Sequence, residues 1–295
     1  MPVSFVAEVS SNHHQDLTRC LAFVDAAAAM GCDAVKFQLF TVATLFAPEI
    51  LARSPVHRDR AAWELPLDFL SDIALRCYEQ NLKFSCTPFY LKAVEQLLPY
   101  VDSYKIASYE LPWDDLLRAC AQTGKPVVLS TGMATMDEIR HASEILYENG
   151  CTHLTVLHCC SGYPTPVHDC NLAAITTIRT ELARWVSLPA VGWSDHTVSP
   201  AVLYRAVHRW GVSMVEFHLD LDGTGDEFKT GHCWLPAQIA PVIAMIRQGE
   251  QADGDGVKVP QPSEAADRDW RRDPSDGLRP TLAMREAWER EHDIN

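Results

Sequence analysis

The chain has 295 residues, of which 47% are hydrophobic and 22% charged, the composition of an ordinary soluble globular protein. A chain of this length forms one large domain or two small ones. Lys and Arg total 25 against 39 Asp and Glu, so the formal net charge is −14. Because so acidic a surface repels phosphate backbones and anionic lipids, the composition argues against nucleic-acid and membrane partners. It leaves room for a small anionic substrate held by a few buried cations.

Three features indicate a cytoplasmic location. The longest uncharged apolar stretch, around residues 235–246, falls short of the ~20 residues that a bilayer span needs. The N-terminal residues carry no basic region ahead of an apolar core, so no secretory signal is visible. The 10 cysteines form no C-x-x-C pair, which favours free, mostly buried thiols in a reducing compartment.

Short β-branched runs alternate with helical patterns along the chain. The predicted strands span residues 5–9, 34–37, 83–86, 103–107, 126–129, 154–158, 190–193 and 214–217. Helix starts are indicated by Asp16 as an N-cap, by Pro66 in a first turn, by the Thr135 and Glu138 capping box and by Ser199-Pro200. Gly31 and Gly211 are placed to end helices.

Eight strand–helix repeats in roughly 250 residues predict a closed (β/α)₈ barrel. A doubly wound open sheet is the alternative, but the Gly-rich loop that usually follows its first strand is missing. We assign the barrel to residues 1–248 and a polar C-terminal extension, with a short helix over 282–291, to residues 249–295. The long connection over residues 41–65 is expected to serve as a lid or a dimer contact.

Polar side chains stand at the end of every predicted strand, where barrel strands converge on one site. A single buried lysine or histidine is more often structural. Polar groups at all eight ends predict a site, because burying unpaired charge is costly. The residues are Glu8, Asn12, His13, Lys36, Gln38, Thr87, Lys105, Ser108, Glu110, Ser130, His158, Ser161, Tyr163, Ser194, Asp195, His196, Glu216 and His218.

Two subsets of these residues indicate what the site binds. Lys36 and Lys105 with several hydroxyls are donors suited to a phosphate or carboxylate. His196 and His218 follow adjacent strands, so both imidazoles can reach one cation such as Mn²⁺, Zn²⁺ or another divalent ion. Asp195 either orients a histidine or caps a loop, and the sequence does not separate these roles.

The ordered motifs resemble the sialic acid synthase (N-acetylneuraminate synthase) family. They recur in family order over residues 5–236, and eight in register make the resemblance specific. The matching pieces are A-E-V-S-S-N-H, D-A-V-K-F-Q, F-S-C-T-P-F, Y-K-I-A-S-Y-E-L, K-P-V-V-L-S-T-G-M-A-T, L-H-C-C-S-G-Y-P-T-P, V-G-W-S-D-H-T and V-E-F-H.

The resemblance implies a homodimeric enzyme that condenses phosphoenolpyruvate with the open-chain aldehyde of a sugar. The products are a 2-keto-3-deoxy sugar acid and phosphate, with cleavage of the C–O bond of phosphoenolpyruvate. It also implies a divalent metal ion, Mn²⁺ or Mg²⁺. A carboxylate such as Glu8 is expected to help deprotonate the attacking water.

The resemblance also implies roles for individual residues. The positions that match phosphoenolpyruvate-binding residues are Lys36, Thr87, Lys105, Ser108, Ser130, Ser161 and Ser194. His196 and His218 match metal ligands, and Glu8 and Glu216 match acidic positions near the reacting carbons. Gln38, Glu110 and Tyr163 match residues that face the sugar.

The chain departs from the family pattern in three places. Ser161 replaces an asparagine, and Phe217 stands where many members have lysine. The loop that normally carries G-P-D reads D-L-D-G-T-G-D-E-F-K-T-G-H-C-W-L-P, in which Asp226 is the candidate sugar-binding aspartate and His232 a possible family histidine. The sequence also stops where the family's antifreeze-like domain would begin, a domain that covers the sugar and supplies an arginine.

Two other functions compete with this one. The first is a metal-dependent aldolase that uses pyruvate or phosphoenolpyruvate with another aldehyde; a Schiff-base version with Lys36 or Lys105 would be trapped by borohydride. The second is a degenerate barrel that only binds sugar. The converging set of Lys36, Lys105, His196 and His218 argues against a mere scaffold.

Overall fold

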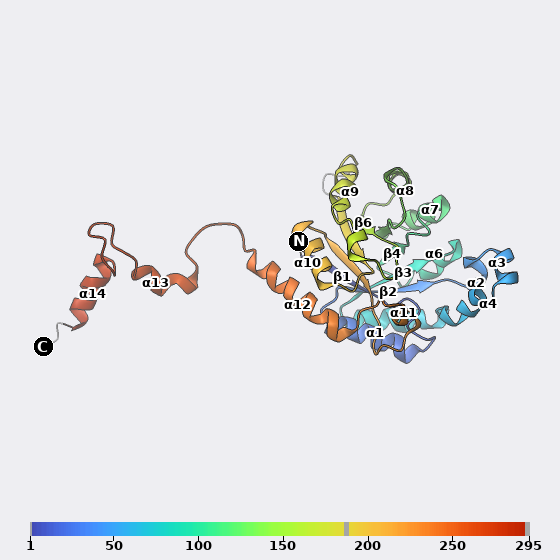
Figure 1. The fold of residues 1–295 in the computed structure, drawn as a ribbon, viewed down its shortest axis with the longest axis horizontal. Helices are drawn as coiled ribbons and strands as arrows, with labels where there is room; N and C mark the ends of the chain where they lie inside the picture. Colours follow the sequence, from blue (N-terminus) through green and yellow to red (C-terminus); the bar gives the residue numbers. More distant parts are fainter. Residues whose placement is uncertain (1, 186–188, 293–295) are drawn as a thin grey trace. The chain divides into compact units, whose positions relative to one another are not determined.

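Eight parallel strands close into a barrel in the computed structural model, which describes residues 2–185 and 189–292 (Figure 1). Each strand pairs with its neighbours in sequence, and β8 pairs with β1, so Glu8 lies opposite both Lys36 and His218. The predicted (β/α)₈ barrel is confirmed. The strands are β1 (Ser4–Glu8), β2 (Ala34–Leu39), β3 (Lys83–Pro88), β4 (Ser103–Ile106), β5 (Val127–Ser130), β6 (Leu154–Cys159), β7 (Ala190–Asp195) and β8 (Met214–His218).

Helices follow the strands and form the outer layer of the barrel (Figure 1). The principal ones are α1 (Leu17–Ala29), α5 (Leu70–Glu79), α6 (Leu91–Leu97), α7 (Asp114–Gln122), α8 (Met136–Glu148), α9 (Ala174–Leu182), α10 (Pro200–Tyr204) and α12 (Pro236–Ala252). A π-helical turn, η4 (Arg205–Arg209), extends α10.

The predicted helix starts are mostly confirmed. The Asp16 carboxylate accepts hydrogen bonds from the backbone N–H groups of Thr18 and Arg19, and Thr135 and Glu138 form the capping box of α8. The expectation for Pro66 is wrong in detail. It precedes the short 3₁₀ turn η2 (Leu67–Phe69), and α5 begins only at Leu70.

The period-two alternation of the strands separates the core into two parts. In β8, Val215 and Phe217 are fully buried in the hydrophobic core, whereas Glu216 and His218 belong to the buried polar set. Lys36 alternates with Val35 and Phe37 in the same way. The polar residues of adjacent strands therefore share the barrel interior, which explains how a fold with a large apolar core also holds buried charges.

Three strand connections contain additional helices or 3₁₀ turns. After β2 the chain forms α2 (Val42–Leu45), α3 (Pro48–Arg53), α4 (Pro55–Arg58) and the 3₁₀ turn η1 (Asp59–Trp63). After β6 comes the 3₁₀ turn η3 (Val167–Asp169), and between β8 and α12 lies α11 (Asp226–Thr230). The insertions after β2 and β8 bring side chains to the site described below.

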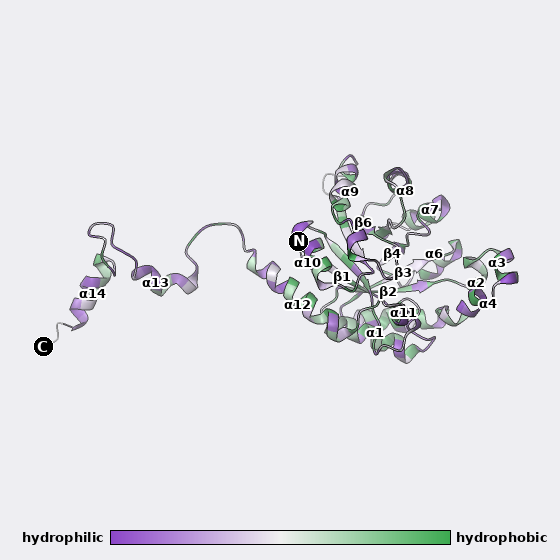
Figure 2. Cartoon of the chain, in the orientation of Figure 1, coloured by the Kyte–Doolittle hydropathy of each residue, from purple (hydrophilic) through white to green (hydrophobic). Residues whose placement is uncertain are grey.

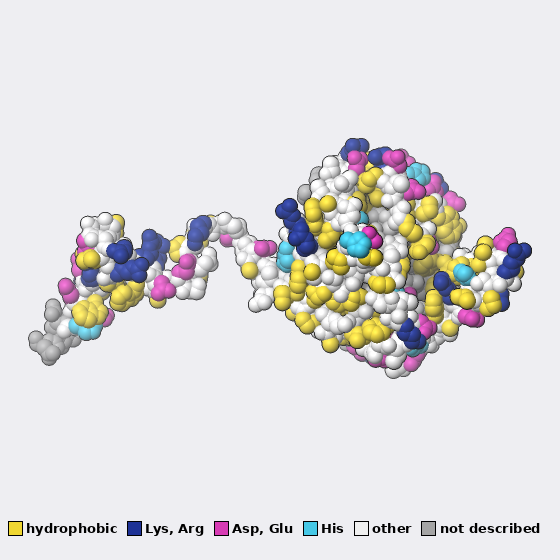
Figure 3. Space-filling view, in the orientation of Figure 1, with side chains coloured by type: hydrophobic (Ala, Val, Ile, Leu, Met, Phe, Trp, Pro, Cys, Tyr) yellow, Lys and Arg dark blue, Asp and Glu magenta, His cyan; other side chains and the backbone are white. Residues whose placement is uncertain are grey.

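Charged and hydrophobic side chains are interspersed over the face of the barrel seen in Figure 3. The outer helices carry both hydrophilic and hydrophobic residues (Figure 2). Among the described residues, none of the helices has the length and apolarity that a membrane crossing requires.

The chain contacts divide the protein into two compact units, Met1–Gly249 and Glu250–Asn295. The second unit contains η5 (Pro262–Glu264), α13 (Ala265–Asp269) and α14 (Leu282–His292), the last of which confirms the predicted C-terminal helix. Asp273 organises this unit, because its carboxylate accepts hydrogen bonds from the backbone N–H groups of Ser275 and Leu282. Arg285 pairs with Asp276 at 2.7 Å.

Candidate active site

A cavity of about 650 Å³ lies at the carboxyl ends of the strands. Most of the predicted site residues line it, and they come from widely separated parts of the sequence. These are Lys36, Gln38, Lys105, Ser108, Glu110, Ser130, Tyr163, Ser194, His196, Glu216, His218 and Asp226. Glu8, Thr87 and Ser161 are not among the lining residues. The volume falls within the range typical of small-molecule sites.

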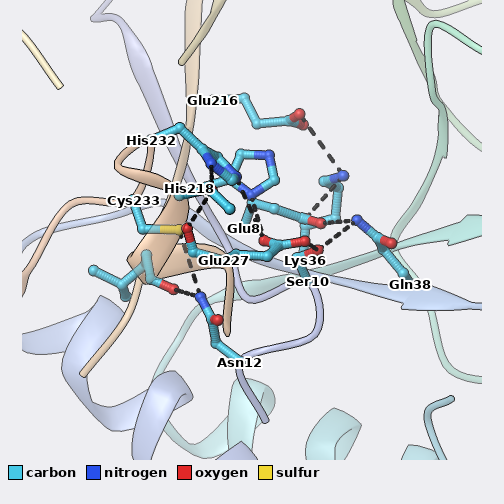
Figure 4. A network of polar contacts seen from close by, with 12 residues as sticks. Glu8, Ser10, Asn12, Lys36, Gln38, Glu216, His218, Glu227, His232 and Cys233 are labelled. Atoms are coloured by element: carbon cyan, nitrogen blue, oxygen red, sulfur yellow. Dashed lines mark hydrogen bonds and ion pairs between the residues drawn. The ribbon is translucent and has the colours of Figure 1, made fainter. Parts of the chain in front are cut away.

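Lys36, Lys105 and Glu216 line the floor of the cavity, and Glu8 lies beneath them against Lys36. Figure 4 shows Glu8, Lys36 and Glu216 together. The Lys36 ammonium lies 2.8 Å from a Glu8 oxygen and 3.7 Å from Glu216 Oε1, and Lys105 Nζ lies 3.3 Å from the same Glu216 oxygen. The exposed fraction of each of these side chains is 5% or less. Both lysines are therefore already paired with carboxylates, where the sequence predicted free donors for an anion.

The lysines and glutamates of this group shift one another's pKa values. Burial alone would raise the pKa of Glu216, but the nearby ammonium groups of Lys105 and Lys36 lower it to about 2. Burial opposes the charge on Lys36 as well, yet Glu216 and Glu8 raise the pKa of Lys36 above its usual range. Glu216 and Lys36 consequently stay charged across the physiological pH range.

Glu8 lies behind Lys36 and has no solvent exposure. Its Oε1 accepts a hydrogen bond of 2.6 Å from the Gln38 amide, and its other oxygen pairs with Lys36. The structure thus places Glu8 against the lysine and the amide. Glu8 does not line the cavity. Its role in deprotonating the attacking water stays a prediction.

Hydroxyl groups surround the two lysines. Thr87 Oγ1 accepts a 3.3 Å hydrogen bond from Lys36, and Ser194 Oγ donates to Glu216 at 3.4 Å. The hydroxyls of Ser130 and Ser161 are buried and have no hydrogen-bond partner among the described residues. Because unsatisfied buried donors are costly, these hydroxyls are available to a bound anion.

Gly132 makes room for this group of hydroxyls. A Cβ atom at this position would lie 2.0 Å from Ser161 Oγ and 2.9 Å from Ser108 Oγ. The close approach lets the Gly132 backbone N–H donate to Ser108 Oγ at 2.9 Å. Ser108 accepts that bond, so its own proton remains available for a ligand.

The two predicted metal-binding histidines are neighbours. The ring centroids of His196 and His218 lie 5.2 Å apart. His196 Nδ1 bonds the Cys160 carbonyl at 2.9 Å and His218 Nδ1 bonds Glu227 at 3.0 Å. Burial lowers the pKa of both histidines, which keeps them neutral and able to donate a lone pair to a cation.

Sequence reasoning missed Glu227 and mentioned His232 only in passing. His218, Glu227, His232 and Cys233 each offer a ligand atom within 4.8 Å of the others (Figure 4). Asp226, chosen from the sequence, pairs instead with Lys229 at 2.7 Å and its side chain is 56% exposed. The sequence feature that could have predicted these ligands is the presence of Glu227 and His232 in the loop that departs from the family pattern.

This cluster fits a divalent cation. Imidazole nitrogens and a carboxylate oxygen are ligands for Mn²⁺, Zn²⁺ and similar ions, and a hard cation such as Mg²⁺ also accepts carboxylate. His218, Glu227 and His232 line the cavity, where an acceptor oxygen can share the ion.

The residues expected to face the sugar line the rest of the cavity. Tyr163 packs its ring on His196, with centroids 4.2 Å apart. Glu110 has one buried carboxylate oxygen without a hydrogen-bond partner among the described residues. Burial raises the pKa of Glu110 to about 7, although Lys105 opposes the shift.

The connection after β2 forms one wall of the cavity. Leu45, Phe46, Arg60 and Trp63 all line it. The Arg60 guanidinium lies 5.4 Å from the Phe46 ring centroid and 5.1 Å from that of Trp63. Its Nε is buried without a hydrogen-bond partner among the described residues. Part of the segment predicted as a lid or dimer contact therefore borders the cavity.

The role of Asp195, left open by the sequence, is structural. Oδ1 accepts hydrogen bonds from Trp193 Nε1 and Thr197, and Oδ2 accepts from Trp234 Nε1 and the Val198 backbone N–H. Asp195 thus caps the loop after β7 and ties it to Trp234.

Comparisons with known proteins agree with this geometry. The NeuB family profile matches residues 23–258. The chain is 30% identical to N,N'-diacetyllegionaminic acid synthase of Campylobacter jejuni, over 88% of the chain and 80% of that protein. It is 29% identical to pseudaminic acid synthase of the same species, over 86% of the chain and 76% of that protein.

A solved structure shares the fold as well. N-acetylneuraminic acid (sialic acid) synthetase from Leptospira borgpetersenii matches with a TM-score of 0.77 at 28% identity, covering 90% of each chain. The family match over most of the sequence and these synthase relatives confirm the resemblance noted from the motifs. The chain belongs to the NeuB family and is an enzyme.

Proposed function

We propose that the enzyme condenses phosphoenolpyruvate with the aldehyde of a sugar similar to N-acetylmannosamine. The products are a sialic-acid-like 2-keto-3-deoxy sugar acid and inorganic phosphate. The observation that carries this proposal is the pairing of Lys36 and Lys105 with one buried glutamate, Glu216, in a cavity that also contains His218. The names of the relatives, synthases of legionaminic, pseudaminic and sialic acids, support the same reaction class.

Phosphoenolpyruvate binds between the lysines and the hydroxyls in this proposal. Lys36 and Lys105 face its negative charge, and the unsatisfied hydroxyls at the cavity floor donate hydrogen bonds. Thr87 and Glu8 position the Lys36 ammonium, because each contacts it and neither lines the cavity. The serines of this set are Ser108, Ser130, Ser161 and Ser194, of which the first two and Ser194 line the cavity.

The acceptor occupies the side of the cavity lined by Gln38, Glu110, Tyr163 and Asp226. Carboxylate, amide and phenol groups suit the hydroxyls of a sugar. His196 and His218 would hold the divalent cation, Mn²⁺ or Mg²⁺, which when bound polarises the acceptor carbonyl as a Lewis acid. Arg60, between its two aromatic rings, adds a positive charge to this wall.

The bond changes balance with one molecule of water. C3 of phosphoenolpyruvate attacks the aldehyde carbon and forms the new C–C bond, and the aldehyde oxygen gains a proton. Water adds to C2, and one of its protons balances the proton gained by the aldehyde oxygen. The new C2 hydroxyl then becomes the keto group as the C2–O bond to phosphate breaks, and its proton goes to the released phosphate. We assign Glu216 to the proton movements, because it lines the cavity beside Lys105 and Lys36.

The cellular setting completes the proposal. All ten cysteines are free, which supports a reducing cytoplasm. The homodimer rests on the family resemblance. The barrel of residues 1–248 would carry the chemistry, and residues 249–295 would be an accessory extension.

The first test is acceptor-dependent release of phosphate from phosphoenolpyruvate with Mn²⁺ and a panel of hexoses and N-acetylhexosamines. We expect His218→Ala to lower the rate at least ~100-fold, since its ring lies in the cavity beside the acceptor. His168→Ala is the matched control, because its side chain is 84% exposed and should leave the rate unchanged.

Labelled water distinguishes the bond that breaks. With ¹⁸O water the label should enter the keto acid, and label in the released phosphate would contradict C–O cleavage. Trapping of substrate on a lysine by borohydride would instead favour a Schiff-base aldolase.

A further inference from the structure

The connection between β8 and α12 brings two additional cation ligands to the pair of histidines already considered. Glu227 lies in α11 and His232 follows it, and both approach His218 at the end of β8 (Figure 4). The side chains are 18% exposed for Glu227 and 5% for His232. Neither residue belongs to the set assigned above to phosphoenolpyruvate or to the sugar.

The spacing of these atoms suits a shared cation. Glu227 Oε2 lies 3.0 Å from His218 Nδ1 and 3.7 Å from His232 Nε2. Ligand atoms bound at ~2.1 Å lie about 3.0 Å apart at octahedral angles and about 3.4 Å apart at tetrahedral angles. The Glu227–His218 distance matches the octahedral value, and the Glu227–His232 distance is about 0.3 Å longer than the tetrahedral value.

Neighbouring groups hold both side chains in place. Thr230 Oγ1 bonds His232 Nδ1 at 2.6 Å, which leaves Nε2 directed toward the glutamate. Ser10 Oγ donates to Glu227 Oε1 at 2.5 Å, and Ser10 also accepts from the Gln38 amide at 3.0 Å. Such outer contacts orient metal ligands in proteins and fix their free atoms.

Cys233 is the fourth member of the cluster, but its sulfur already has a partner. Asn12 Nδ2 donates to Cys233 Sγ at 3.6 Å, and the same amide also donates to the Leu219 carbonyl at 3.0 Å. A soft sulfur is in any case a poor ligand for Mn²⁺ or Mg²⁺.

We propose that Glu227 and His232 complete the cation site with His218, so that this chain holds its metal with more protein ligands than the two strand-end histidines. Two nitrogens and one carboxylate oxygen leave coordination positions open for His196, for water or for the acceptor. The cation is then held by the last residue of β8 and two residues of the connection that follows, without a contribution from either substrate. The proposal deepens the function proposed above, on which it relies for the role of the ion.

The test measures metal binding without either substrate, so that failure of the synthase assay would not affect it. The EDTA-treated full-length protein is titrated with Mn²⁺, and free Mn²⁺ is counted by electron paramagnetic resonance. Wild type should bind one ion per chain. His232→Ala and Glu227→Gln should each weaken Kd by about 100-fold, and Glu227→Asp, which keeps the carboxylate, should weaken it less.

Asp226→Asn is the matched control, because Asp226 neighbours Glu227 in α11 but pairs with Lys229. Its Kd for Mn²⁺ should equal that of wild type. Thermal unfolding in EDTA shows that each variant is folded, and Glu227→Asp provides the second variant if Glu227→Gln is not. Wild-type affinity in folded His232→Ala and in a folded Glu227 variant would overturn the proposal.

Discussion

Glu110 is a carboxylic acid that ionises near neutral pH. Its pKa rises from the usual 4.5 to about 7 because it is buried at the cavity wall. In the folded protein it therefore keeps a proton that the unfolded chain has already lost between these two values. Between these pH values unfolding releases this proton. Rising pH therefore favours the unfolded chain, and this group makes the protein less stable as pH rises from 4.5 to 7.

Replacing Glu110 by Gln should remove this pH dependence, because the amide resembles the protonated acid at every pH. Measured by urea denaturation, the stability of Glu110→Gln relative to wild type should be about 2.5 kcal/mol more favourable at pH 8 than at pH 5. A difference between the two proteins that stays constant with pH would mean that Glu110 titrates in its ordinary range.

The choice between Asp226 and Glu227 shows where sequence reasoning stops at the residue scale. Adjacent residues of a helix point about 100° apart, so the two neighbouring acids border the cavity but meet different groups, and of the two it is Glu227 that bonds His218. Nothing in the letters D-E indicates which one. The choice depends on how α11 is placed by Gly225, whose backbone N–H donates to buried Asp220, and that placement is a tertiary contact.

At the scale of elements, the strands and long helices were predictable because their periodicity extends over many residues. Short β-branched runs identified all eight strands to within about two residues, and most of the polar strand ends line the cavity. The helices α2, α3 and α4 have four to six residues each, too few for a helical period to be recognised. The wall formed by Phe46, Arg60 and Trp63 could therefore be located as a connection but not resolved into side chains.

Asp195 joins two elements and should control stability more than catalysis. Its carboxylate accepts from two indole N–H groups and holds Val198 at a positive φ of 53°, which a β-branched residue rarely adopts. Asp195→Ala would leave both buried indoles without an acceptor. At about 1–3 kcal/mol for each unsatisfied group, we expect a loss of roughly 3 kcal/mol in the free energy of unfolding.

Denaturant unfolding of Asp195→Ala and Asp195→Asn measures this loss. The asparagine variant keeps one acceptor oxygen and should lose less. Thr197→Ala, which removes a single donor from the same carboxylate, is the control and should cost about 1 kcal/mol. Equal stability of wild type and Asp195→Ala would show that the indoles find other acceptors.

For the whole molecule, the division at Gly249 predicts where the chain can be cut. Residues 251–272 are exposed, and Lys258 lies in a stretch without regular secondary structure. The lysines and arginines of the barrel helices, by contrast, belong to hydrogen-bonded elements that must open before a protease can act. Brief trypsin treatment of the full chain should therefore cut first after Lys258 or at the arginines that follow it.

The fragment that ends at Lys258 should unfold at the same temperature as the intact protein, because the hydrophobic core residues all precede residue 250. Phosphate release by that fragment then shows whether residues 259–295 contribute to the acceptor site. Mass spectrometry of the first products and calorimetry of the purified fragment give both answers. First cuts within the barrel, or a fragment that unfolds at a much lower temperature, would show that the two units depend on each other for stability.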